Sequence, residues 1–350
     1  MAEGMTDPDA AGGTLPYGPT PVREWRDVDP GAFAEIVARN QPAVLRGAAD
    51  RWPLVAQARR SPGALVEYLI AFDSGRLVTT ALVAPGEKGR LAYKDELKAL
   101  NHRHSSEKLP SVLKGLLRLL EDPDPPGVSI AALRAEENLP GLAEENRTGL
   151  VPAGTHPHLW IGNAVTVAPH FDAADNLAFV VAGRRRFTLF PPDQTANLYV
   201  GPFDVTPAGV PIGMVPQDAA DLERYPRYRE ALAAAQVAQL EPGDAIYIPY
   251  LWWHGVQSLE GLNMLVNFWW YSDAVAAAHP QGVLLRAAYE LFRDMPAEHR
   301  RAWRHLYDYW VFGAQGDPLE HLPPEQRTAP ARLDPEAIAR FKQAVVDLLS

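Results

Sequence analysis

The 350-residue sequence contains no cysteine. Disulfide bonds and thiolate metal ligands are therefore excluded, so any bound metal ion must use histidine, carboxylate and water. The formal net charge of −10 leaves no basic excess to attract a phosphate backbone, so we expect no nucleic-acid partner.

Long apolar runs are also missing at the beginning of the sequence. Residues 1–21 contain Asp7, Asp9 and several glycines, and they lack the apolar stretch that a signal peptide or a membrane span needs. We expect a flexible tail here, and a cytoplasmic protein without a membrane partner. The sequence does have a hydrophobic content of 47%, which is enough for a substantial core.

Residues 22–154 predict a mixed α and β segment that packs on the core. Capping residues followed by proline mark helix beginnings, and runs of β-branched residues predict strands. The predicted elements are helices beginning at Asp29-Pro30 and Ser61-Pro62, strands over Pro42–Gly47 and Leu77–Val83, a helix over Val112–Leu120 before a proline-rich linker, and helix or loop over residues 131–150.

Residues 155–272 consist of short apolar runs separated by turn residues, which predicts a β-rich core. These runs suit a jelly-roll or cupin-type double sheet, whose narrow interior often holds a metal ion. The expected fold class is mainly β with flanking helices (α+β). A long excursion between strands ends in a predicted helical piece, Tyr228–Gln236. The predicted strands are Leu159–Ile161, Val165–Asp172, Leu177–Val181, Arg185–Phe190, Ala238–Leu240, Ala245–Ile248, His254–Ser258 and Met264–Trp270.

Residues 273–350 return to helical spacing and predict three helices, over Val275–Phe292, Pro296–Phe312 and Pro335–Leu349. The middle one carries Trp303 and Trp310 among other apolar residues, which is more apolar surface than a lone helix can leave in water. We expect it to pack on the core or on a second copy of the chain, which makes this region a candidate for homodimerisation.

His170 and Asp172 are separated by one residue, and His254 follows an apolar run. Alternate side chains of a strand share a face, so positions 170 and 172 can point into one cavity while a later strand supplies a third ligand. Two imidazoles and one carboxylate leave the opposite face of an octahedral ion open, as in non-haem Fe(II) oxygenases. The alternative for His254 is a buried histidine bonded to a backbone carbonyl. Asp172 needs an ion or an arginine to balance its charge among apolar neighbours.

Three consecutive arginines, residues 184–186, begin a strand-like run. Arg185 shares a face with Phe187 and Leu189, and we expect one guanidinium to face inward. It could hold the distal carboxylate of a 2-oxo acid through paired hydrogen bonds, whereas the alternative is three solvated arginines on an edge strand.

Two asparagines and two tryptophans lie near the predicted ligands. Asn176 and Asn267 belong to otherwise apolar strands, where an interior amide must find partners in a cosubstrate or in backbone groups. Trp253 and Trp269 are packing residues first, and their places beside ligand positions predict that they also shape a substrate pocket.

Several motifs follow one another in the order typical of a known family. They are Trp160-Ile161-Gly162-Asn163, His170-Phe171-Asp172, Asn176, the run from Gly183 to Pro192, Leu240-Glu241-Pro242-Gly243-Asp244, Trp252-Trp253-His254 and Val266-Asn267-Phe268-Trp269. Together they resemble the cupin-like JmjC hydroxylases, and among these the bacterial relatives of the asparaginyl hydroxylase that inhibits hypoxia-inducible factor.

This resemblance implies Fe(II) ligation by His170, Asp172 and His254. It also implies that Arg185 stands where the family usually has a lysine that binds the 5-carboxylate of 2-oxoglutarate. Asn176 and Asn267 match asparagines that line the cosubstrate pocket. Val167 occupies the position three residues before the first ligand, where relatives often have a hydroxyl residue, and Thr166 beside it is the candidate for that role.

The leading hypothesis is an oxygenase that uses Fe(II), 2-oxoglutarate and O2 to hydroxylate a C–H bond of a protein side chain or a small metabolite. A second hypothesis is a catalytically silent module that binds metal or cosubstrate and acts through protein interaction. A third is a redox-neutral cupin isomerase. A ligand set with a single carboxylate favours oxygenation over the third.

Overall fold

The computed structural model describes residues 18–94, 99–203, 211–217, 220–271, 280–314 and 316–323, together with residues 340, 343 and 346. Internal contacts divide the chain into one unit of Met1–Trp270 and a second of Tyr271–Ser350. The finer division predicted from sequence, at residues 21, 154 and 272, stays a prediction.

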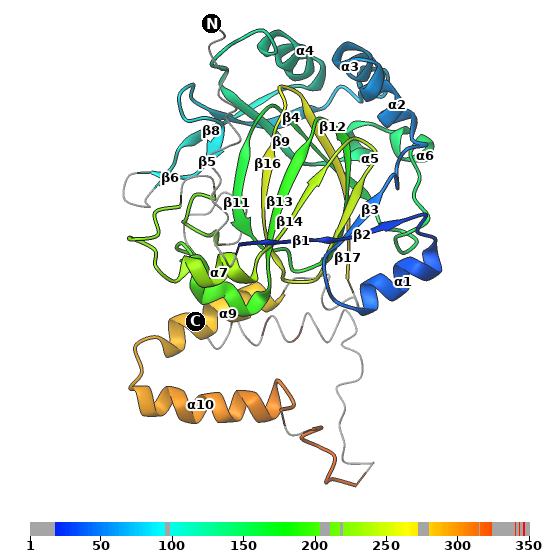
Figure 1. The fold of residues 1–350 in the computed structure, drawn as a ribbon. Coiled ribbons are helices and arrows are strands. Elements are labelled where there is room, and N and C mark those ends of the chain that lie inside the picture. The colour runs from blue at the N-terminus through cyan, green and yellow to red at the C-terminus, as the bar shows by residue number, and fades with distance from the viewer. Residues whose placement is uncertain are drawn as a thin grey trace, which may run out of the picture. The chain divides into compact units, whose positions relative to one another are not determined.

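Two large β-sheets form the first unit (Figure 1). The six-stranded sheet has the order β1 (Thr20–Pro21), β14 (Gln236–Leu240), β13 (Arg185–Phe190), β16 (Trp253–Ser258), β11 (Thr166–His170), β5 (Arg90–Leu91). The nine-stranded sheet has the order β2 (Arg23–Arg26), β3 (Ala43–Arg46), β15 (Ala245–Ile248), β12 (Asp175–Ala182), β17 (Asn263–Trp270), β10 (Pro157–Gly162), β9 (Gly127–Arg134), β4 (Leu77–Val83), β8 (His102–Lys108). A small sheet pairs β6 (Tyr93–Lys94) with β7 (Ala99–Leu100).

Side-chain alternation divides the core into layers. The interior between the two large sheets contains residues of both, including Phe187 and Leu189 of β13 and Ala178 and Val180 of β12. The other face of the nine-stranded sheet packs against helices, and the other face of the six-stranded sheet packs against the excursion that follows β13. The first unit is therefore a double sheet with a narrow interior, and the predicted jelly-roll class is confirmed.

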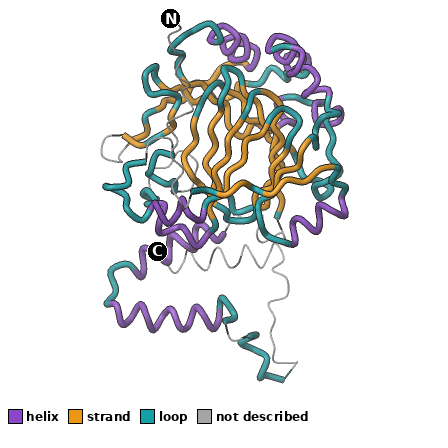
Figure 2. Tube along the Cα trace, viewed as in Figure 1, coloured by secondary structure: helices purple, strands orange, loops and turns teal. Residues whose placement is uncertain are grey.

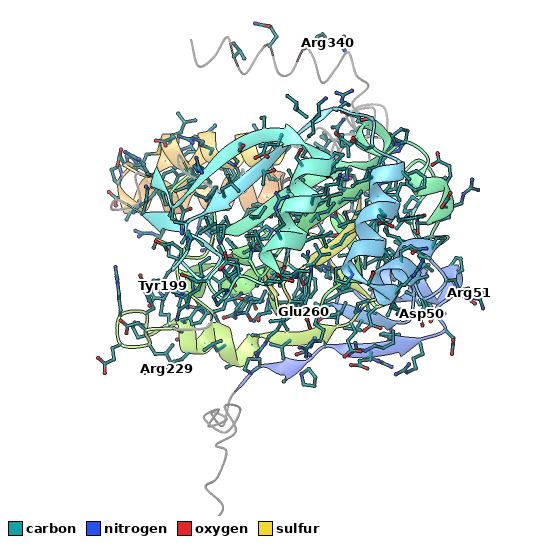
Figure 3. All side chains as sticks on the ribbon, turned by 90° about the horizontal axis from the view of Figure 1, so that it is seen from above. Asp50, Arg51, Tyr199, Arg229, Glu260 and Arg340 are labelled. Carbon is teal, nitrogen blue, oxygen red and sulfur yellow. The ribbon has the colours of Figure 1, made fainter. Side chains whose placement is uncertain are left out.

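The helices of the first unit lie outside the strands (Figure 2). Two of them begin as the capping pattern predicts, because Asp29 accepts a hydrogen bond from the backbone of Ala32 and Ser61 accepts one from Ala64. At the end of α2, Arg59 donates to Asp50, which is labelled in Figure 3. The helices are α1 (Pro30–Ala38), α2 (Pro53–Arg60), α3 (Pro62–Ala71), α4 (Leu109–Leu119), α5 (Ala135–Asn138), α6 (Leu142–Glu145), the 3-10 helix η1 (Pro192–Leu198) and α7 (Tyr228–Ala234).

The prediction of helix or loop for residues 131–150 is wrong for residues 131–134, which belong to strand β9. It pairs with β4 on one side and β10 on the other, so its place is determined by long-range pairing. Ala132 has a positive φ of 48°, and the pairing with β10 shifts register there, which breaks the alternation that would mark a strand. Helix α7 also ends two residues earlier than predicted, because Gln236 begins β14.

The second unit contains α9 (Pro280–Phe292) and α10 (Ala297–Trp310). Phe292 at the end of α9 contacts the rings of Trp303 and Tyr307 on α10. Of the third predicted helix, Pro335–Leu349, the structure describes residues 340, 343 and 346, which are helical, and the beginning of the first predicted helix lies outside the described residues. Within the described part of the chain, no helix combines the length and apolarity needed to cross a membrane.

Candidate metal centre

His170, Asp172 and His254 meet in the interior between the sheets. His170 at the end of β11 is the direct strand partner of His254 on β16, so the two imidazole rings lie 4.4 Å apart between their centroids. One possible ligand atom from each of the three residues lies within 4.8 Å of the others. The geometry brings together the three side chains that the sequence pattern selected.

Both imidazoles present the same nitrogen to this cluster. Nδ1 of His170 lies 3.0 Å from the carbonyl oxygen of Ala168, and Nδ1 of His254 lies 3.0 Å from that of Trp252. A carbonyl oxygen only accepts, so each Nδ1 carries a hydrogen and Nε2 is the nitrogen left for a metal ion. Nε2 of His254 lies 3.5 Å from Oδ2 of Asp172. Backbone hydrogen bonds thus fix the tautomer that a metal ligand requires.

Burial lowers the pKa of His254 well below its ordinary value, and the neighbouring His170 lowers it further. Asp172 and the Trp252 carbonyl act in the opposite direction without cancelling this effect. The imidazole is therefore neutral near pH 7, which is the form that binds divalent metals.

A chain of hydrogen bonds orients the Asp172 carboxylate from the nine-stranded sheet. Oδ2 accepts from Nε1 of Trp269 at 2.9 Å and from Nδ2 of Asn176 at 3.2 Å. Asn176 Oδ1 in turn accepts from Asn267 Nδ2 at 3.2 Å, and Asn267 Oδ1 accepts from Trp160 Nε1 at 2.8 Å. These four side chains hold one carboxylate in place, and they face the interior from β10, β12 and β17.

Arg185 is the one of the three consecutive arginines that faces inward. It is buried, whereas Arg184 and Arg186 are exposed, and it shares its face of β13 with Phe187 and Leu189. Its Nη2 makes a long hydrogen bond of 3.4 Å to the Trp160 carbonyl, and its Nε finds no partner among the described residues. Burial lowers its pKa to about 10, so the group keeps its charge at neutral pH. A buried cation that has no anionic partner among the described residues is suited to a ligand carboxylate.

The structure does not bring Thr166 or Trp253 to this interior. Val167 pairs with Val256, which packs in the interior, so Thr166 next to it faces the opposite side of β11. Trp253 precedes His254 and likewise faces outward, where it packs with Phe171 and donates to Thr195. Trp269, by contrast, directly contacts the cluster through Asp172. Trp160 was not selected from the sequence, because its link to Asn267 spans 107 residues.

Residues 30–275 match the cupin-like domain family. The chain belongs to this family. It is 28% identical to the human bifunctional peptidase and (3S)-lysyl hydroxylase JMJD7 over 282 residues, which are 72% of this chain and 81% of that protein. The predicted membership of the cupin-like JmjC-domain family is therefore confirmed.

Two other relatives match a shorter part of this chain. Human HSPB1-associated protein 1 is 36% identical over 120 residues, which are 33% of this chain and 24% of that protein. The Arabidopsis thaliana lysine-specific demethylase JMJ31 is 35% identical over 117 residues, which are 33% of this chain and 21% of that protein. The match thus spans about a quarter of the length of these two relatives.

Proposed function

We propose that this chain is an Fe(II)- and 2-oxoglutarate-dependent oxygenase that hydroxylates a C–H bond of a protein side chain. The observation that carries the proposal is the meeting of two imidazoles and one oriented carboxylate in the interior of a double sheet. This donor set occupies one face of an octahedral ion and leaves the other face for cosubstrate and O2.

His170, Asp172 and His254 would hold the iron. Their hydrogen bonds fit this role, because both Nε2 atoms are free to ligate and Asp172 already accepts from Asn176 and Trp269 through one oxygen. When bound, iron and 2-oxoglutarate together supply the oxidising power for hydroxylation, with succinate and CO2 as coproducts. The protein orients the ligands and limits access of water.

Arg185 would bind the distal carboxylate of 2-oxoglutarate. Its guanidinium is charged, buried and incompletely bonded, and a carboxylate can accept two parallel hydrogen bonds from it. Asn176 and Asn267 bond one another and Asp172, so we assign them to orientation of the carboxylate at the edge of the cosubstrate pocket.

A protein side chain is the proposed substrate because the names of two relatives, a (3S)-lysyl hydroxylase and a lysine-specific demethylase, describe reactions on lysine residues. A small metabolite is the alternative substrate. The silent-module and isomerase hypotheses differ from this proposal in consuming no 2-oxoglutarate.

Succinate release with Fe(II), 2-oxoglutarate, ascorbate and O2 tests the proposal. We expect slow uncoupled turnover by the wild type, loss of that turnover in His170→Ala, and wild-type turnover in His104→Ala, which changes an exposed histidine on β8. Equal succinate release by the wild type and His170→Ala would defeat the proposal. Metal binding without any succinate release would favour the silent module.

A further inference from the structure

A cavity of about 510 Å³ lies against the outer face of β11, the face on which Thr166 is found. Thr166 and Ala168 form one wall, and the segments 90–94 and 212–217 form the others together with Asp221, Arg224 and Tyr225. Its volume lies within the range of small-ligand pockets, roughly 300–1,000 Å³. It shares no residue with the cluster of His170, Asp172 and His254.

Gln217 lines this cavity, and its side-chain amide makes no hydrogen bond to the described residues. Both its Oε1 and its Nε2 are buried, and neither has a partner in the described part of the chain. Gly255 makes this position possible, because a Cβ there would lie 1.7 Å from Nε2 of Gln217. A buried amide with both ends unpaired is costly, and a ligand or water molecule that pairs with both ends would remove that cost.

Tyr93 contributes a second polar group to the same cavity. Its hydroxyl is buried and makes no well-aligned hydrogen bond to any described residue. Burial raises the pKa of Tyr93, and the backbone of Ile212 offsets this only in part, so the hydroxyl keeps its proton at neutral pH. It can therefore donate to a carbonyl oxygen or accept from an N–H group.

We propose that this cavity is a docking site for a peptide segment of the protein substrate, which it binds through an amide group. Gln217 offers an N–H donor group at one end of its amide and a carbonyl acceptor at the other, and a ligand that pairs with both ends must offer an acceptor and a donor. A carboxylate offers only acceptors and an ammonium offers only donors, whereas a peptide amide offers both. The inference rests on the proposed function, because it names a segment of the substrate of the same enzyme.

The docking site adjoins the strands that carry both histidines. Gly255, which Gln217 covers, follows His254, and the carbonyl of Ala168 in the cavity wall accepts from Nδ1 of His170. The backbone of Gly213 donates to Pro169, which connects the 212–217 segment to the same strand. A segment docked here is held on the opposite side of the sheet from the candidate iron site. Docking therefore contributes affinity for the substrate and leaves the reacting atoms untouched.

Ligand-observed NMR titration with a capped tetra-alanine peptide tests this inference. We expect saturable binding to the wild type and binding at least about tenfold weaker to Gln217→Leu, which loses two hydrogen bonds. The matched ester analogue, which lacks amide N–H groups, should bind the wild type more weakly than the peptide does. Tyr93→Phe removes one hydroxyl and should weaken peptide binding by a smaller factor, which keeps the test available if Gln217→Leu does not fold.

Gln239→Leu is the matched control, because it changes an exposed glutamine on β14 outside the cavity, and it should bind the peptide like the wild type. Equal binding by Gln217→Leu and Gln239→Leu, or no saturable binding by the wild type, would overturn the inference. The succinate assay on the wild type tests the proposed function separately, because peptide binding observed by NMR requires neither iron nor turnover.

Discussion

Trp269 holds the candidate iron ligand Asp172 through a hydrogen bond of 2.9 Å from its indole nitrogen. Partners of this kind typically change metal affinity by about 10–100-fold when removed. We therefore expect Trp269→Phe to weaken Fe(II) binding by about tenfold or more, as measured by anaerobic calorimetry. Trp270→Phe is the control, because Trp270 stacks on Tyr247 at the end of the same strand. A similar loss in both variants would assign the effect to packing.

Arg185 belongs to the proposed cosubstrate pocket, so its replacement should lower the affinity for 2-oxoglutarate rather than the stability of the fold. A hydrogen bond to a charged group contributes about 1.5–3 kcal/mol, which predicts a KM for 2-oxoglutarate raised by about tenfold or more in Arg185→Met. Arg186→Met on the exposed face of β13 should leave that KM unchanged. Without cosubstrate, the free energy of unfolding of Arg185→Met should not fall, because the variant removes a buried charge that has no anionic partner in the described part of the chain.

A KM that stays at the wild-type value in Arg185→Met would exclude Arg185 from cosubstrate binding. A fall in the free energy of unfolding as large as the loss of cosubstrate affinity would instead assign Arg185 a structural role through its bond to the Trp160 carbonyl.

Strand periodicity predicted most of the residue positions in the interior. It places His170, His254 and Arg185 inward, and the structure agrees, although their function as ligands stays a prediction. Strict alternation along a strand also places Trp253 on the opposite face from His254, and Thr166 on the opposite face from Val167. The hydrogen-bonded chain through Trp160 could not be predicted, because it depends on strands that pair across about a hundred residues.

At the scale of elements, Gly162 marks a close approach of β10 to β9. A Cβ at this residue would lie 2.3 Å from the carbonyl oxygen of Val128, and the backbone of a paired strand cannot move aside. We expect Gly162→Ala to lower the free energy of unfolding by about 2 kcal/mol, as measured by chemical denaturation. Gly149→Ala is the control, since no atom lies within 4 Å of a Cβ there. Equal stability of the two variants would refute the close approach.

Local sequence determined some elements completely and others hardly at all. Strand β4 has the bounds predicted from its run rich in β-branched residues, Leu77–Val83, and α1 and α3 begin at proline after a capping residue. Strand β9 was not predicted because a bulge at Ala132 disturbs its alternating pattern. In the fold, pairing with β4 and β10 holds this strand in place. Elements that depend on partners distant in sequence are those that a local pattern misses.

For the whole molecule, the exposed apolar residues of the second unit predict association. Trp303, Leu306, Trp310 and Phe312 are 43%, 48%, 57% and 71% exposed, and the first three share one side of α10. A helix of this length is not stable alone in water, and apolar stripes of this kind are normally covered. A second copy of the chain is the cover that we expect, which would make the protein a homodimer through these helices.

Light scattering after size-exclusion chromatography checks this expectation. Leu306→Glu combined with Trp310→Glu places two charges in the apolar stripe, so the wild type should have the mass of a dimer and the variant that of a monomer. Arg301→Glu changes charge on the opposite side of α10 and should remain dimeric. A monomeric wild type would show that the stripe packs against another part of its own chain, the alternative that the sequence left open. In that case the variant should lower the free energy of unfolding without changing the mass, so the two measurements together separate association from internal packing.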